Sequence, residues 1–239
     1  MSVLDRVLLA GAVEECEPVT PSMRRVRISG TGLRDLDWVP GQHVRLKVGD
    51  LLSPQVWLSG FRDVLRTYSI WHYDRGGILD LCVLDHPGAG PGALWARGAV
   101  PGTKVLLTRP DGRLVVRRES PYHLFAGDET ALAAFDAMLR AVPAGEPVYG
   151  AVTVPAADHR LPLARLADLT WVYGDGGASE ALVGAVRELS LPAGPGTAYV
   201  AGEARACQAV LRHLVRERGW PRAAVRVKAF WAPGKRGMD

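Results

Sequence analysis

The sequence predicts a two-domain β plus α/β protein, in which a β-barrel is followed by an open α/β sheet. The pattern of apolar residues and turn signals changes near residue 120 of the 239-residue chain. Before this point, short apolar or alternating runs are separated by Gly and Pro, which is typical of a barrel. After it, strand-like and helix-like segments alternate, which indicates βα units on a parallel sheet. We therefore expect domains at residues 1–118 and 119–239.

The first half contains a series of short predicted strands and one helix. Turn signals such as Pro40-Gly41 and Pro101-Gly102 separate the strands. The helix is expected at about Pro91 to Ala99. The runs predicted as strands are Arg24 to Ile28, His43 to Val48, Thr67 to His72, Leu79 to Leu84 and Lys104 to Thr108.

The second half contains predicted strands and helices in alternation. The strands are Tyr122 to Ala126, Val148 to Val154, Leu169 to Tyr173 and Ala198 to Ala201. The helices are Glu129 to Arg140, Ser179 to Leu189 and Glu203 to Arg218. Because open parallel sheets bind ligands at the carboxyl ends of their strands, the loops after these four strands should face the site.

The composition is that of an ordinary globular protein, with 48% hydrophobic and 23% charged residues. The 29 basic and 25 acidic residues are interspersed, and their net charge of +4 favours an anionic ligand over nucleic acid. No apolar stretch reaches the roughly 20 residues that cross a bilayer. The three cysteines show no CxxC spacing. We expect a cytoplasmic monomer without membrane insertion, disulfide framework or metal site.

The first chemical motif is Arg66-Thr67-Tyr68-Ser69-Ile70, on a predicted barrel strand. Strand alternation places Arg66 and Tyr68 on one face and Thr67 and Ser69 on the other. An arginine can clamp a phosphate through two hydrogen bonds, while a tyrosine two residues on covers a neighbouring ring or ribose. This face is suited to a nucleotide. The alternative is a surface arginine beside a tyrosine of the barrel wall.

The second motif is a Gly-rich turn that opens the short predicted helix, with Pro91 in its first turn. The free amide groups of a helix start attract anions, and small residues let a phosphate approach the backbone. Gly90 to Ala93 is therefore a candidate pyrophosphate cradle. A plain Gly-rich loop is the alternative, but the phosphate-clamping Arg66 upstream favours the cradle.

These motifs, with two runs in the second half, resemble the siderophore-interacting protein family of the ferredoxin-reductase superfamily in order and spacing. The matching runs are Arg66 to Ile70, Val83 to His86, Gly90 to Ala96, Gly127 to Leu132 and Ala201 to Ala204. The resemblance implies an FAD-binding antiparallel Greek-key barrel and an NAD(P)H-binding-like α/β domain. It also implies a ferric-siderophore reductase, which passes electrons from NAD(P)H through FAD to Fe(III).

The resemblance further implies roles for individual residues of the barrel. Arg66 would bind the FAD phosphates, while Tyr68 and Ser69 would lie along the flavin, with Ser69 near its N5 edge. Other implied members of the cofactor pocket are Thr67, Val83, Leu84, His86, Gly90, Pro91, Gly92 and Ala93.

In the second domain, Asp128 and Thr130 would face the isoalloxazine ring. Trp231 would lie near the flavin, or alternatively close a core. The implied nicotinamide side consists of Gly127, Gly202, Glu203, Ala204 and Asp175. Because Asp175 would repel a ribose 2′-phosphate and no cation stands beside it in the sequence, NADH is favoured over NADPH. Candidate cations for the rim of a siderophore cleft are Arg97, Lys228 and Lys235.

Two other functions remain open at this level. Where the family often has a second arginine, this chain has Ile70-Trp71, which removes one expected cofactor contact. A family member recruited to natural-product biosynthesis would act on an organic substrate or use the flavin without redox chemistry. A non-catalytic module would only bind flavin or siderophore. No Ser-His-Asp or Cys-His pattern is convincing, so the chemistry would come from the flavin.

Overall fold

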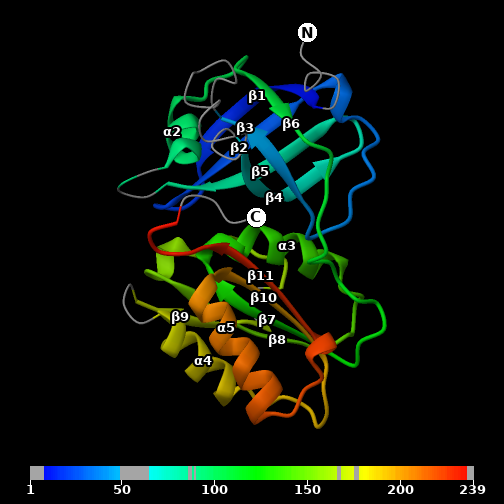
Figure 1. Cartoon of the computed structure of the whole chain (residues 1–239). Coiled ribbons are helices and arrows are strands. Elements are labelled where there is room, and N and C mark those ends of the chain that lie inside the picture. Colours follow the sequence, from blue (N-terminus) through cyan, green and yellow to red (C-terminus); the bar gives the residue numbers. More distant parts are fainter. Residues whose placement is uncertain are drawn as a thin grey trace. The chain divides into compact units, whose positions relative to one another are not determined.

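The computed structural model describes residues 8–48, 65–85, 88, 90–165, 168–174 and 178–235. The chain divides into two compact units, Met1–Arg113 and Leu114–Asp239 (Figure 1). The first unit holds a closed antiparallel barrel and the second a parallel sheet flanked by helices. The predicted fold class is therefore confirmed.

Six strands in the order β1-β2-β5-β4-β3-β6 close the barrel. They are β1 (Leu9–Pro18), β2 (Met23–Ser29), β3 (His43–Lys47), β4 (Leu65–Asp74), β5 (Ile78–Leu84) and β6 (Lys104–Leu107). The helix α2 (Pro91–Gly98) connects β5 to β6, and a short 3-10 turn (Thr31–Leu33) follows β2. Hydrogen-bonded neighbours in this sheet are antiparallel throughout.

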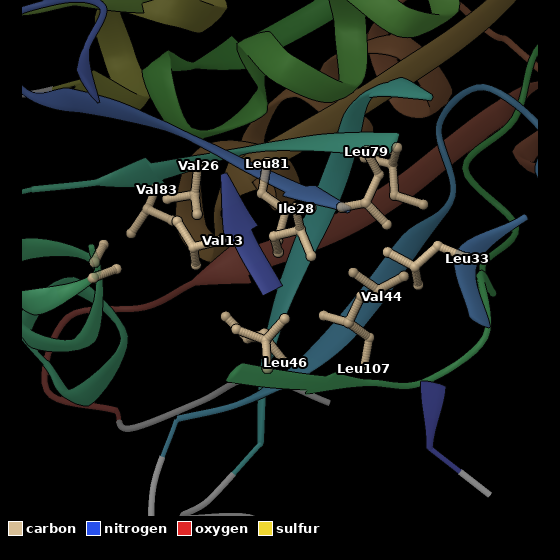
Figure 2. Packing of buried hydrophobic residues seen from close by; sticks show 14 of the residues in the cluster. Val13, Val26, Ile28, Leu33, Val44, Leu46, Leu79, Leu81, Val83 and Leu107 are labelled. Carbon is tan, nitrogen blue, oxygen red and sulfur yellow. The ribbon is translucent and has the colours of Figure 1, made fainter. Parts of the chain in front are cut away.

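Alternate residues of these strands fill the barrel, as Figure 2 shows for Val26 and Ile28 on β2 and for Leu79, Leu81 and Val83 on β5. Each of these side chains is at most 1% exposed. Strand alternation thus sends one set of side chains inward along each strand. Ala96 of α2 is fully buried in the same core, so the helix packs on the barrel with its apolar face.

The second unit is a five-stranded parallel sheet in the order β11-β10-β7-β8-β9. Its strands are β7 (His123–Asp128), β8 (Val148–Val154), β9 (Thr170–Tyr173), β10 (Thr197–Glu203) and β11 (Val225–Trp231). Its helices are α3 (Leu132–Ala141), α4 (Ala178–Glu188) and α5 (Ala204–Arg212), which continues as one π-helical turn (His213–Glu217). The described part of this unit also holds 3-10 turns at Glu129–Ala131, Ala157–His159 and Arg222–Ala224.

The helices cover both faces of this sheet. In Figure 1, α4 and α5 lie side by side, and their apolar residues share a core with Leu124 and Ala126 of β7. Phe125, the residue between these two on the strand, contacts Phe135 of α3 edge to face. Because neighbouring residues of a strand point to opposite faces, α3 lies on the face away from α4 and α5. None of the helices in the described ranges is long and apolar enough to span a membrane.

Candidate functional site

The two barrel motifs meet where α2 packs on β4. A Cβ atom at Gly92, in the first turn of α2, would lie 1.9 Å from the Tyr68 hydroxyl oxygen and 3.5 Å from Cγ of Arg66. No real side chain tolerates the first of these distances, so only glycine fits here. The structure therefore brings Arg66, Tyr68 and Gly92 together.

The register of β4 decides which of its side chains face this contact. Arg66 lies opposite Leu46 and Tyr68 opposite Val44, and both partners on β3 are fully buried. Tyr68 itself packs against the barrel core. Alternation places Thr67 and Ser69 on the other face of the strand, where Thr67 is exposed and Ser69 half-buried.

Burial controls the chemistry of Tyr68. It raises the pKa of the phenol to about 12, while the positive charge of Arg66 acts in the opposite sense. The hydroxyl therefore keeps its proton at neutral pH and can donate a hydrogen bond. One guanidinium nitrogen of Arg66 donates to the carbonyl oxygen of Leu65 at 2.9 Å, which holds the cation beside the start of β4.

The amino end of α2 is suited to an anion. Its N-cap residue, Gly90, has an extended backbone and makes no side-chain capping hydrogen bond to the first turn. Pro91 has no N–H, so the amides of Gly92 and Ala93 are the donors that the helix itself leaves without acceptors. Among the described residues, a Cβ at Gly90 would meet nothing within 4 Å. The guanidinium of Arg66 and the backbone amides of Gly92 and Ala93 form a donor set that fits the diphosphate of a dinucleotide.

The remaining barrel residues of the predicted pocket lie in varied surroundings. Val83 is 1% exposed and packs in the barrel core (Figure 2). Leu84 is half-buried at the end of β5, and Pro91 is exposed. His86 lies outside the described residues.

Arg97, a predicted rim cation, is ion-paired. Its Nε donates to Asp85 Oδ1 at 2.6 Å, and Nε of Arg24 donates to the other oxygen of the same carboxylate at 3.1 Å. Arg97 first and Arg24 second hold the pKa of Asp85 below its usual range. The carboxylate therefore stays ionised at neutral pH, and it ties α2 to the ends of β2 and β5.

In the second unit, Asp128 joins the carboxyl ends of the central strands. Its Oδ1 accepts from the backbone N–H of Thr130 at 2.9 Å and also bonds the Thr130 hydroxyl. Its Oδ2 accepts from the backbone N–H of Glu203 at 2.7 Å and from the indole of Trp231 at 3.0 Å. Burial raises the pKa of Asp128 above its ordinary value, while these hydrogen bonds act to lower it.

Two glycines allow these strand ends to converge. Gly202 has φ +121°, and a Cβ there would lie 2.5 Å from Asp128 Oδ2. A Cβ at Gly127 would lie 2.3 Å from the carbonyl oxygen of Ala201. Glycine is therefore required at both positions for the strand ends to pack, which the sequence motif alone did not indicate.

Glu203 lies directly after Gly202 and caps α5, which begins at Ala204. Its Oε2 accepts from the backbone N–H of Ala206 at 2.7 Å and from the Ser179 hydroxyl at 3.3 Å. Its Oε1 is buried and has no hydrogen-bond partner in the described part of the chain, and the residue is 7% exposed. Since buried polar atoms are normally paired, Oε1 calls for a hydrogen-bond donor beyond those of the described residues.

Family comparison agrees with these motifs. The family model for the siderophore-interacting FAD-binding domain matches residues 12–114, and the model for the siderophore-interacting protein matches residues 120–234. The chain belongs to the siderophore-interacting protein family. It therefore carries that family's FAD-binding domain in its barrel unit.

Curated relatives of this siderophore-interacting protein include one with a named activity. The uncharacterized protein Rv2895c of Mycobacterium tuberculosis is 28% identical over 96% of this chain and 92% of its own. The ferric vibriobactin reductase ViuB of Vibrio cholerae is 27% identical over 73% of this chain and 66% of its own.

Solved structures show the same fold. The siderophore-interacting protein SipS of Aeromonas hydrophila matches with a TM-score of 0.82 at 24% identity, over 96% of this chain and 93% of its own. The ferredoxin reductase of carbazole 1,9a-dioxygenase matches with a TM-score of 0.70 at 19% identity, over 94% of this chain and 66% of its own. The protein thus has the fold of ferredoxin reductases.

The last strand of this siderophore-interacting protein carries Lys228 and Trp231. A register shift between β10 and β11 places Trp231 opposite Glu203, which brings the indole to Asp128. The side chain of Trp231 is 42% exposed, so the alternative that it closes a core is wrong. Lys228 is half-buried opposite Ala201, and Lys235 is exposed beyond the strand. Asp175 lies outside the described residues.

One polar group at the carboxyl edge was missed by sequence reasoning. Arg160, from the loop after β8, lies over the rings of Trp171 and Tyr173 on β9. The only sequence signal was a pair of aromatic residues two apart on a short strand. The arginine comes from a different loop, so spacing alone did not connect it to them.

Proposed function

We propose that this protein is an FAD-dependent oxidoreductase that passes electrons from NAD(P)H to the Fe(III) of a siderophore. The observation that carries the proposal is the closeness of Tyr68 and Arg66 to Gly92 in the first turn of α2. It unites a cation, helix amides and an aromatic ring on one small surface. The 27% identity to the ferric vibriobactin reductase ViuB supports the choice of substrate class.

In this proposal the barrel holds the cofactor through named groups. Arg66 and the amides of Gly92 and Ala93 bind the FAD diphosphate, and Tyr68 covers the adjoining part of the molecule as a neutral phenol. Bound FAD supplies the redox chemistry, because a flavin accepts a hydride and returns electrons one at a time. The chain's own task is to bind and orient. It needs no acid–base pair for that task.

The second unit would bind the electron donor at the carboxyl edge of its sheet, where open α/β sheets bind ligands. Glu203 Oε1 is the buried acceptor at this edge, and it suits an amide or hydroxyl donor of a pyridine nucleotide. Asp128 and the two glycines act through packing, because their contacts are made within the protein.

Binding of FAD is tested first, with a matched pair of charge reversals. Arg66→Glu sets a carboxylate against the diphosphate and should weaken FAD binding by at least about a hundredfold, as like-charge contacts in a site cost several kcal/mol. Arg45→Glu reverses an exposed charge on β3, where Arg45 lies opposite Thr67 on the outer face, and should change the affinity little. If the two variants bind FAD with equal affinity, Arg66 does not contact the diphosphate.

Electron transfer is tested with the FAD-loaded protein. The protein is photoreduced under argon and mixed with ferric citrate or with hydroxamate and catecholate ferric siderophores, while a ferrous chelator reports iron release. We expect the flavin to reoxidise and Fe(II) to appear with at least one siderophore. If the reduced flavin persists with every iron complex, the siderophore substrate is wrong, and an organic substrate or a non-catalytic binding role takes its place.

A further inference from the structure

The outer face of α5, the orange helix in Figure 1, carries a row of arginines. Arg205, Arg212 and Arg216 are all exposed, and they are seven and four residues apart. Arg216 stands in the π-helical turn that continues α5. Residues at these spacings lie on one side of a helix. With a rise of about 1.5 Å per residue, the row is about 17 Å long. We call these three side chains the arginine row.

Packing fixes the direction of the arginine row. On the inner side of the helix, Ala206, Val210 and Leu214 are at most 4% exposed and belong to the core that α5 shares with α4 and the sheet. Because the helix cannot turn about its axis without exposing these residues, the row stays directed toward the solvent. The one other exposed residue within the span of the row is Gln208, which is uncharged.

The positive charge of the arginine row is not neutralised within the described ranges. No carboxylate there forms an ion pair with any of its members. Glu217 is the only acidic residue from Ala204 to Glu217, and its carboxylate is turned toward α4, where Nη2 of Arg187 donates to both oxygens at 3.0 Å. The exposed acids of α4 itself, Glu180 and Glu188, pair with none of the three arginines. The row therefore presents uncompensated charge to an anionic partner.

The chemistry of this face indicates which anionic partner it fits. A protein interface has aromatic or aliphatic anchors at its centre, and the arginine row has none. Proteins that bind DNA through its phosphates make on the order of 6–10 phosphate contacts, which is more than three side chains supply. A bilayer that contains anionic lipids requires neither anchors nor a fixed spacing, because its headgroups move laterally to meet each cation.

We propose that the arginine row docks this protein on a membrane surface that contains anionic lipids, with α5 lying along the headgroups. The inference does not depend on the proposed function, because no member of the row belongs to the FAD site or to the donor site. Each basic side chain at such a surface favours binding by about fivefold, so three favour it by about a hundredfold. The attachment is reversible and electrostatic, without insertion of apolar side chains.

The test is flotation of the FAD-loaded full chain with vesicles of phosphatidylcholine, either alone or with phosphatidylglycerol at about 30%. We expect binding to the anionic vesicles to exceed binding to the neutral vesicles by at least about tenfold at low salt. The difference should disappear at about 1 M salt, where the Debye length is about 3 Å and exposed charges are screened.

Replacement of Arg205, Arg212 and Arg216 together by glutamine should reduce binding to the level seen with neutral vesicles. Replacement of the same three residues by lysine should retain most of the binding, because attraction to a charged surface depends on charge rather than on the planar guanidinium. Glutamine and lysine form helices about as well as arginine, so both variants should keep the melting temperature of the wild type.

The matched control replaces Arg34, Arg75 and Arg109 by glutamine. These arginines are exposed in the barrel unit, and their loss lowers the net charge by the same amount. This variant should bind anionic vesicles like the wild type. Absence of binding to anionic vesicles, equal binding to neutral vesicles, or an equal loss in both glutamine variants would each overturn the docking surface.

Double-stranded DNA and polyglutamate are tested with the same variants, because they represent the other classes of anionic partner. If either binds the wild type as tightly as the anionic vesicles do, and loses that binding with the arginine row, a membrane is not the specific partner and the proposal is wrong. FAD affinity should be equal in all variants. A chain that binds no FAD but docks on anionic vesicles through the row supports this inference and contradicts the proposed function.

Discussion

At Gly92 the chain has no room for a side chain, because the Tyr68 hydroxyl occupies the place of a Cβ at 1.9 Å. Gly92→Ala should therefore push α2 away from β4 or displace Tyr68. Overpacking of this kind costs about 1–3 kcal/mol. We expect FAD affinity, measured by flavin fluorescence titration, to fall about tenfold or more.

Gly98→Ala is the control in the same helix. A Cβ at Gly98 would meet nothing within 4 Å, and alanine is a better helix former than glycine. This variant should bind FAD like the wild type and be equally or slightly more stable. If FAD affinity falls equally in both variants, α2 tolerates substitution at neither position. The loss in Gly92→Ala would then not be caused by the contact with Tyr68.

Asp128 accepts hydrogen bonds from three different segments, and an amide can accept at only one of its two terminal atoms. Asp128→Asn should leave at least one buried donor unpaired, at a cost of about 1–3 kcal/mol. Urea unfolding of the second unit should report this loss as a lower midpoint. Glu180→Gln, which changes an exposed acid on α4, should leave the midpoint unchanged. If the Asp128→Asn variant is as stable as the wild type, water replaces the lost acceptor.

Residue types and spacing pointed to Arg66, Tyr68 and Gly92, which the structure places close together, while their binding of a phosphate stays a prediction. They did not reveal that Val83 is a core residue or that Arg97 is paired with Asp85. Such facts depend on register and on partners far away in the sequence. Arg160 was missed for the same reason, since its aromatic neighbours stand on another strand.

At the scale of elements, the strands with clear alternation were predicted well, whereas β1 and β11 were not. A register shift between Val13 and Glu15 breaks the alternation of β1, and Val13 is its only buried residue. β11 has only one buried residue and carries basic side chains, so its apolar pattern is weak. The predicted helix from Glu129 begins with a 3-10 turn, because the Asp128 side chain caps that turn at Thr130.

The tie between α2 and the barrel predicts a pH dependence. The pKa of Asp85 is depressed by Arg97 and Arg24, so its ion pairs stabilise the protein above the ordinary carboxyl range, and this contribution is lost as the pH falls through the lowered pKa. Asp85→Asn should lower the melting temperature at pH 7. The difference from the wild type should shrink as the pH falls below 4 (about the ordinary carboxyl pKa).

Glu17→Gln is a suitable comparison, because Glu17 forms an exposed ion pair with Arg25 on the barrel surface. Exposed pairs contribute about 0–1 kcal/mol. The Asp85 variant should also weaken FAD binding at neutral pH, whereas the Glu17 variant should not. A constant difference in melting temperature at all pH values would contradict an electrostatic role for Asp85.

At the scale of the whole molecule, the chain divides into the compact units Met1–Arg113 and Leu114–Asp239, and the predicted FAD site belongs to the first. FAD at about a hundred times its dissociation constant should stabilise the unit that binds it by about 2.7 kcal/mol. Hydrogen exchange should therefore slow most in β4 and α2. Protection confined to the second unit would contradict a barrel site for FAD.

The hydrogen bonds of Asp128 also bear on how the chain folds. Its partners Glu203 and Trp231 lie 75 and 103 positions further along the sequence. Contacts of such long range form slowly, because the chain between the two residues loses entropy on closing before the hydrogen bond can form. During synthesis, β7 would emerge with its terminal carboxylate unpaired, and the edge proposed to bind the donor would stay incomplete until β11 had docked. An intermediate that lacks β11 would expose the side of β10, a candidate surface for chaperone recognition or for premature association between nascent chains.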